Sequence, residues 1–196
     1  MSATRLVQVL VAVAIAALSS PVPRAQTDDV VEYRVLATSK TSTLEKELNE
    51  AAEAGFRFVT VMGGETAIGG KEAVSIMSRH KGDHGRYMYK LLATSKTSTM
   101  QKEMQQAADA GFEYRSQTVF ESLIGGKEVV AIMERDKDQP TAGMYQYKLF
   151  ATTKTSTMQK ELQEAGDQGF EVLGMTVAST AIGGKELVAI ARRKVR

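Results

Sequence analysis

The sequence predicts an α+β protein of three tandem βαββ repeats, each a three-stranded sheet with one helix on one face, packed as one pseudo-symmetric body. The first observation behind this prediction is internal repetition. Similar stretches begin at Tyr33, Tyr89 and Tyr147, 56 and 58 residues apart, and keep their motifs in the same order. The second is a change of hydrophobic period within each stretch, from two residues to 3.6 and back to two. The repeats are expected at 32–79, 88–135 and 146–193.

Each repeat is expected to open on a strand that leads into a helix. In the first repeat, YRVLAT places Tyr33, Val35 and Ala37 on one face, which is the alternation of a strand. Apolar residues at helical spacing then predict a helix with one inward-facing stripe. In the first repeat this stripe is Leu44, Leu48, Ala51 and Ala52; in the second it is Met100, Met104, Ala107 and Ala108; in the third it is Met158, Leu162 and Ala165.

Both ends of the predicted helix carry end signals. Ser42 with Glu45 fits a capping box, in which the two side chains bond amide groups of the first turn. A glycine is expected in the left-handed conformation just after the helix. The same signals recur as Ser98 with Gln101 and Ser156 with Gln159, and the three glycines are Gly55, Gly111 and Gly169.

Two further apolar segments, FRFVTVM and EAVSIMS in the first repeat, predict two more strands. A helix of this length returns the chain so that the first two strands run parallel and the third runs antiparallel. The third strand is apolar or small on both faces, with Val74 and Ile76 on one face and Ala73 and Met77 on the other. One face is expected to pack on the helix and the other on a sibling repeat, because a unit this small buries too little area alone. A compact pseudo-threefold body and a continuous multi-stranded sheet both satisfy this expectation.

The IGGKE segment at 68–72, 124–128 and 182–186 admits two interpretations, a phosphate-binding loop and a tight turn. A Walker-type loop reads G-x-x-x-x-G-K-[ST] and is followed by a helix. Gly64 and Gly69 have that spacing, but Gly70 then takes the position of the Lys, and Glu72 follows Lys71. A Gly pair between two apolar segments is typical of a two-residue hairpin turn, so such a hairpin is expected.

The Ser/Thr/Lys segments before the three helices are candidate anion sites. Unpaired amide groups and the helix dipole favour negative charge at a helix N-terminus, and the lysines and hydroxyls add to this. The alternative is that the hydroxyls only cap the helix and the lysines are solvated. The candidate residues are Lys40, Thr41, Ser42, Lys96, Thr97, Ser98, Lys154, Thr155 and Ser156.

Metal sites, cofactors and catalytic groups are not expected. The chain has no Cys, and His80, Asp83 and His84 form H-x-x-D-H beside glycines that disfavour the helix such a metal pair needs. The methionines at helical spacing are expected in the core, since a copper-handling role would need exposed, converging sulfurs. No Ser/His/Asp arrangement or catalytic carboxylate pair is visible.

Residues 1–26 have the features of a secretory signal peptide. Arg5 precedes an apolar stretch from Leu6 to Leu18, which as a helix rises about 20 Å, short of a hydrocarbon core of roughly 30 Å. A cleaved signal is therefore favoured over a spanning helix, with cleavage between Ser19 and Gln26. The mature protein is expected to be periplasmic or secreted, without a membrane span.

The charge balance argues against nucleic-acid binding. Of 25 basic and 23 acidic residues, the predicted signal contains Arg5 and Arg24 and no acid. The remaining chain is close to neutral and lacks the broad positive field that nucleic acids require.

Each repeat resembles the small bacterial domains grouped as domain of unknown function 4177. The shared features are Tyr-Arg or Tyr-Lys at the start, a helix ending ELNEAAEAGF in the first copy, and a last strand that closes on Arg79, Arg135 or Arg193. Where that family often has Gly-Trp, this chain has Gly-Phe, as at Gly55 and Phe56. The resemblance implies no catalytic residues.

These observations favour an exported, non-enzymatic binding or structural module of a bacterial cell envelope. Its partner would be an envelope or extracellular protein or a small ligand. The alternatives are an anion or small-ligand binder that uses the three helix N-termini, and an enzyme of unidentified class.

Overall fold

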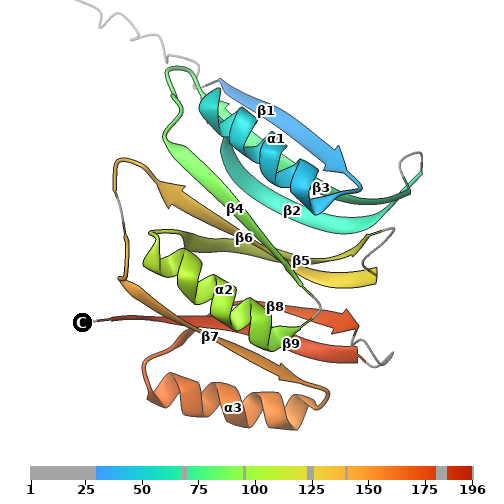
Figure 1. The fold of residues 1–196 in the computed structure, drawn as a ribbon, viewed down its shortest axis with the longest axis vertical. Helices are drawn as coiled ribbons and strands as arrows, with labels where there is room; N and C mark the ends of the chain where they lie inside the picture. Colours follow the sequence, from blue (N-terminus) through green and yellow to red (C-terminus); the bar gives the residue numbers. More distant parts are fainter. Residues whose placement is uncertain are drawn as a thin grey trace, which may run out of the picture.

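The computed structural model describes residues 30–67, 70–94, 96–122, 126–139, 141–179 and 185–195. The predicted signal peptide lies outside this part. The prediction of an α+β fold with three βαββ repeats is confirmed (Figure 1). The first unit comprises β1 (Val31–Thr38), α1 (Thr41–Glu53), β2 (Arg57–Thr66) and β3 (Gly70–His80); the second β4 (Tyr87–Thr94), α2 (Thr97–Asp109), β5 (Glu113–Ser122) and β6 (Gly126–Asp136); the third β7 (Tyr145–Thr152), α3 (Thr155–Asp167), β8 (Glu171–Ser179) and β9 (Lys185–Lys194).

Each unit forms its own sheet, with the last strand in the middle. The strand orders are β1-β3-β2, β4-β6-β5 and β7-β9-β8, and every pair is antiparallel. The first and second strands of a unit therefore run parallel on either side of the third, as the sequence predicts. The expectation of one continuous sheet is wrong, because no strand of one unit pairs with a strand of another among the described residues.

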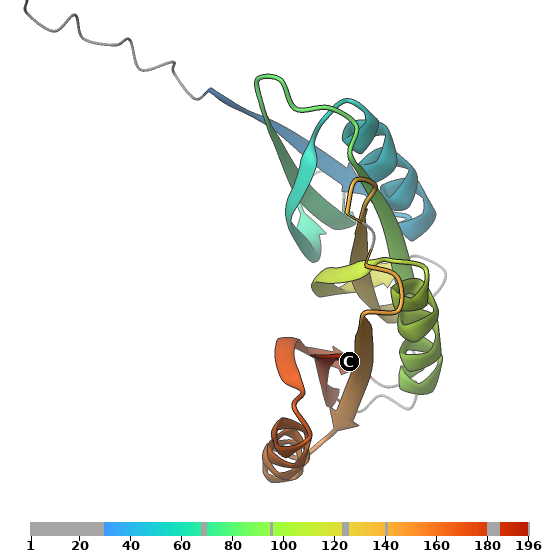
Figure 2. The same cartoon turned by 90° about the vertical axis from the view of Figure 1, so that its left-hand side faces the viewer.

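The units follow one another along the long axis of the molecule, with the first at the top and the third at the bottom of Figure 1. They are related by a repeated step along a stack and do not close around a threefold axis. Figure 2 shows α1 and α2 on the same side of this stack and α3 at its lower end. Helix α1 contacts both the strands of its own unit and β4 of the next, and α2 contacts β7 in the same way.

The helix C-termini confirm the predicted role of the glycines. Gly55 has a φ of 90°, and the Phe56 amide donates to the Ala51 carbonyl at 3.0 Å, while the Gly55 amide donates to the Ala52 carbonyl at 2.9 Å. This is the Schellman arrangement, which needs a left-handed residue. Gly111 and Gly169 repeat it with φ of 88° and 80°.

The core confirms that the central strand packs on both faces. In the second unit, Val130 and Ile132 are fully buried and join a cluster with Leu44 and Leu48 of α1. The other face of the same strand carries Ala131 and Met133, which pack under α2 with Met100 and Met104. Those two methionines are at most 1% exposed, so their sulfurs are core atoms and the copper-handling alternative is wrong.

The first unit departs from this pattern on one face. The residues Val74 and Ile76 are only half-buried, because no other unit among the described residues covers this face of the sheet. Burial of both faces of the central strand therefore depends on a neighbour.

The expected hairpin around IGGKE is confirmed by the pairing of its flanking strands, which ends at Thr66 with Gly70, Ser122 with Gly126, and Ser179 with Lys185. The expected two-residue turn is wrong, because more than two residues lie between the last paired positions. The turn residues between these pairs lie mostly outside the described residues. Gly70 itself begins β3 with a φ of 69°. Within the described part of the chain, no helix is long and apolar enough to cross a membrane.

Candidate functional site

Neighbouring units are joined by a contact set that occurs twice, and we call each set a seam. In the first seam, the outer edge of β4 is bonded by side chains of α1. The Tyr89 amide donates to Asn49 Oδ1 and Asn49 Nδ2 donates to the Tyr89 carbonyl, both at 2.9 Å. The Leu91 amide donates to the Glu45 carboxylate at 2.7 Å. Since an edge strand leaves one row of backbone groups without a strand partner, α1 takes the place of that strand.

The second seam repeats these bonds between α2 and β7. Gln101 Oε1 accepts from the Leu149 amide at 2.7 Å and its Nε2 donates to the Tyr147 carbonyl at 2.8 Å. Gln105 Oε1 accepts from the Tyr147 amide at 3.0 Å. The first seam joins Glu45, Asn49, Arg57 and Phe58 of the first unit to Tyr89, Leu91 and Glu134 of the second. The second seam joins Gln101, Gln105, Glu113 and Tyr114 of the second unit to Tyr147, Leu149 and Arg192 of the third.

The predicted capping boxes are wrong in all three helices. The N-cap residues are Lys40, Lys96 and Lys154, and these make no side-chain hydrogen bond to the first turn. The serines predicted as caps, Ser42, Ser98 and Ser156, lie inside the helices. Glu45 and Gln101 bond the strand edge of the next unit and not their own helix end.

A buried tyrosine crosses each seam, and we call Tyr89 and Tyr147 the seam tyrosines. The Tyr89 hydroxyl accepts from the Phe58 amide at 2.8 Å, and the Tyr147 hydroxyl accepts from the Tyr114 amide at 2.9 Å. A β-bulge interrupts the strand directly after each of these amides. The seam tyrosines are 3% and 2% exposed, so each lies between two units.

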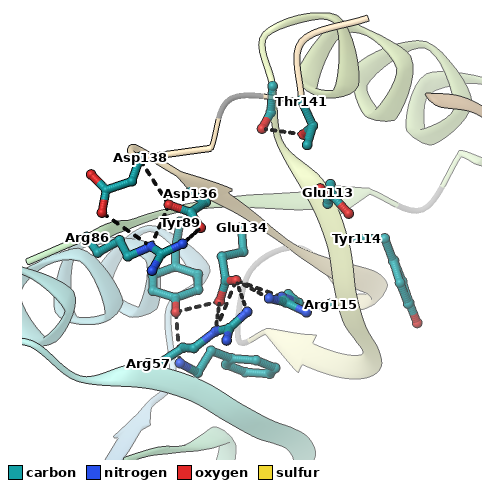
Figure 3. A network of polar contacts seen from close by, with 12 residues as sticks. Arg57, Arg86, Tyr89, Glu113, Tyr114, Arg115, Glu134, Asp136, Asp138 and Thr141 are labelled. Atoms are coloured by element: carbon teal, nitrogen blue, oxygen red, sulfur yellow. Dashed lines mark hydrogen bonds and ion pairs between the residues drawn. The ribbon is translucent and has the colours of Figure 1, made fainter. Parts of the chain in front are cut away.

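An ion pair also crosses each seam, but its polarity reverses. In the first seam Arg57 of the leading unit pairs with Glu134 at 2.9 Å; in the second, Glu113 of the leading unit pairs with Arg192 at 2.9 Å. Glu134 lies at the centre of the network in Figure 3, where it also bonds Arg115 and accepts from the Tyr89 hydroxyl at 2.8 Å. Two guanidinium groups compensate for the burial of this carboxylate, which is 4% exposed.

The pKa shifts and the bonding partners in this network indicate that Glu134 has a structural role between two units. Burial raises the pKa of Glu134, while the Tyr89 hydrogen bond and the charge of Arg57 act to lower it. Burial also raises the pKa of Tyr89 well above its ordinary value. A perturbed buried carboxylate can mark an active site, but here the carboxylate already bonds Arg57, Arg115 and Tyr89. We infer that Glu134 holds two units together.

A cleft of about 330 Å³ lies next to this network, where the first linker passes the first unit. Two of its charged groups are already engaged: Asp83 accepts from the His80 amide at 2.7 Å, and Arg86 pairs with Asp136 at 2.5 Å. Among the described residues, no group of three or more His, Asp or Glu side chains is placed to hold a metal ion. The cleft is lined by Gly55, Arg57, Ser78, His80, Asp83, His84, Arg86 and Tyr87.

The candidate anion loops lie one in each layer of the stack, at the start of α1, α2 and α3, and do not converge (Figure 1). In each loop a threonine at the end of the preceding strand accepts from the amide of the N-cap lysine, at 3.2 Å for Thr38 and Lys40. Lys40, Lys96 and Lys154 are exposed. The loops are separate and solvent-facing, and anion binding at Lys40, Thr41, Ser42 and their counterparts stays a prediction.

The two ends of the stack each expose one half of a seam. Tyr33, the counterpart of the seam tyrosines, is 68% exposed. On α3, Gln159 and Gln163 are the counterparts of Gln101 and Gln105, and both are exposed. We call the open face of the first sheet (Tyr33, Val35, Val59, Met62) the leading end, and the open face of the third unit (Gln159, Gln163, Val172, Met175, Val177) the trailing end.

No family model matches the chain, and none of the curated proteins or solved structures compared with it matches it either. The resemblance to the domain of unknown function 4177 stays a prediction. The functional inference therefore depends on the geometry of the units.

The seam residues were missed by sequence reasoning, although a signal for them is present. Asn49 follows Glu45 by four residues, and polar pairs at the same two positions recur in the second and third helices. Residues four apart share one helix face, so each helix carries a polar pair beside its apolar stripe. The position of that pair predicts a second partner for the helix, distinct from its own sheet.

Proposed function

We propose that this protein is an exported, non-enzymatic structural and binding module of a cell envelope, which acts through protein contacts at the two ends of its stack. The observation that supports this most directly is the distribution of exposed large apolar side chains. Among the described residues none of them lies in the second unit, which has a neighbour on each side. They are Val30, Tyr33, Val35, Val59 and Met62 in or just before the first unit, and Val172, Met175, Val177 and Val195 in or just after the third unit.

The two ends carry these side chains at positions that the interior of the stack buries. Met62 is 73% exposed at the leading end, and Met175 is 58% exposed at the trailing end. Val61, the counterpart of Met175 in the first unit, is only 7% exposed, because the second unit covers it. Contiguous exposed apolar residues on a folded protein mark an interaction surface. Repeat proteins commonly act through such surfaces.

The non-enzymatic part of the proposal is supported by the state of the polar groups. Glu134 and Asp136 are each paired with arginine, and the three candidate anion loops are dispersed over separate layers. A catalytic site needs a nucleophile or an acid–base pair that converges on one pocket. The export part is supported by the predicted signal peptide at residues 1–26.

Site-specific photo-crosslinking in the cells that export the protein tests this proposal. A photoreactive residue is placed at Met62, at Met175, or at Lys102, an exposed control position on the middle helix. We expect protein adducts from Met62 and Met175 and none from Lys102. Equal labelling at all three positions, or no protein adduct from either end, would contradict the proposal.

A further inference from the structure

We propose that the protein stacks head to tail on further copies of itself, with the trailing end of one copy covering the leading end of the next. The inference rests on the proposed function, because it names the partner of the two ends. Its basis is continuity with an interface that the chain already forms twice. The stack contains two complete seams, and its ends present the two halves of a third.

The helix half of the third seam is present on α3. Gln159 and Gln163 occupy the positions of Gln101 and Gln105, which bond the edge of β7. The residue types are the same at both positions. Helix α3 therefore offers the donors and acceptors that α2 uses.

The strand half is present on β1. The register of β1 against β3 pairs Tyr33 with Ser78 and Val35 with Ile76, as the register of β4 against β6 pairs Tyr89 with Glu134 and Leu91 with Ile132. The backbone groups of β1 that face away from β3 are consequently the counterparts of the groups of β4 that α1 bonds. The exposed ring of Tyr33 then takes the place of a seam tyrosine, whose hydroxyl would accept from the Val172 amide.

The side chains that would meet have compatible sizes. In the second seam, a Cβ atom at Gly174 would lie 2.3 Å from the hydroxyl oxygen of Tyr114. The large side chain of Tyr114 therefore requires a glycine opposite. The corresponding pair in the third seam is Val172 and Thr60. A smaller side chain on the trailing end thus leaves room for the larger one on the leading end.

The charges are also compatible. The position of the seam ion pair would hold Glu171 of one copy and Ser78 of the next. This pair contains no like charges, and the serine hydroxyl can donate to the carboxylate. The third seam would lack an ion pair, so we expect it to be weaker than the two internal seams and to depend on concentration.

A heterologous contact of this kind gives an open filament, or a ring if the rotation between copies closes. Sedimentation velocity of the exported protein, over a concentration series up to about 1 mM, separates these from a monomer. We expect species larger than one chain whose population grows with concentration. A monomer throughout the series overturns the proposal, and crosslinks from Met62 to a different protein would then leave the proposed function in place.

Two blocked variants test the polarity of the contact. Tyr33→Asp closes the leading end, and Met175→Asp closes the trailing end; both side chains are exposed, so we expect native circular dichroism and melting. Each variant alone should associate about 30-fold more weakly or worse, as expected for loss of an interface hot spot. An equimolar mixture should form a one-to-one dimer and nothing larger, because only one pair of open ends remains.

Lys102→Glu on the middle helix is the matched control and should assemble like the original protein. Self-association of Met175→Asp alone would indicate that two leading ends pair with each other, which overturns the head-to-tail arrangement. A mixture that stays monomeric while the original protein assembles overturns it as well.

Discussion

Replacing Tyr89 by Phe removes one oxygen atom from the first seam and leaves the ring in place. That oxygen accepts from the Phe58 amide at 2.8 Å and donates to Glu134 at 2.8 Å. The Phe58 amide belongs to the first unit and the Glu134 carboxylate to the second. The substitution therefore weakens the bond between units without removing an apolar contact.

The expected cost follows from the burial of these groups. A buried amide that loses its acceptor costs about 1–3 kcal/mol. The carboxylate loses one donor but keeps Arg57 and Arg115, so its share is the smaller one. We expect a total of about 2 kcal/mol in the free energy of unfolding, which for a chain of this size lowers Tm by about 4–8 °C.

Thermal and urea unfolding followed by far-UV circular dichroism measure this change, since the chain has no Trp for fluorescence. Tyr33→Phe is the matched control, because Tyr33 is 68% exposed and a surface change of this kind is usually worth less than about 0.5 kcal/mol. Tyr147→Phe should resemble Tyr89→Phe. Equal losses for Tyr33→Phe and Tyr89→Phe, or no loss for Tyr89→Phe, would refute the assignment of the seam tyrosines.

Three further predictions concern the core, pH and anions. Met104→Ala should cost about 2–5 kcal/mol in urea unfolding, whereas Leu162→Ala, at the equivalent but half-exposed position of α3, should cost clearly less; equal costs would contradict the open trailing end. Burial raises the pKa of Tyr114 from 10.0 to about 12, so the folded protein keeps a proton that the unfolded chain loses, and the free energy of unfolding should fall as pH rises from about 10 toward 12. Absorbance at about 295 nm should show Tyr114 and the seam tyrosines ionising at higher pH than free tyrosine. Normal titration of all tyrosines would show that these rings are not buried. Titration calorimetry with phosphate and sulfate should give heat that Lys154→Ala reduces if the helix N-termini bind anions, and no heat at millimolar anion would exclude those sites.

The unit could be predicted from sequence because its signals are local. The period of Leu44 and Leu48, the glycine at Gly55 and the alternation of the last strand all act within a few residues, and each formed as expected. Because the motifs recur at fixed offsets, the same prediction applied to all three units. The same reasoning found that the last strand packs on both faces.

The contacts between units could not be predicted in the same way. Glu45 fits a capping box, but its partner is the Leu91 amide, 46 residues further along the chain. Arg57 and Glu134 are separated by 77 residues, and their counterparts in the second seam have the opposite charges. Comparing the three copies shows that the residues at positions 57, 113 and 171 are not all alike, and that those at 78, 134 and 192 differ, without showing that the two positions pair.

The stacking of the units depended on the same unseen contacts. A continuous sheet and a closed threefold body satisfy the apolar pattern of the last strand equally well. The polar pairs on α1 and α2 bond the open edges of β4 and β7, and so occupy the edges to which a strand of another unit would have to pair.

The reversal of the seam ion pairs has a consequence for folding fidelity. Three similar units on one chain can pair out of order while the chain folds, and repeat proteins are prone to such misassembly. If the first unit met the third directly, Arg57 would face Arg192, and if two middle units from different chains met, Glu113 would face Glu134. Like charges placed opposite each other at an interface are unfavourable. The reversed order of acid and base in the two ion pairs therefore favours the native order of the units over the other pairings.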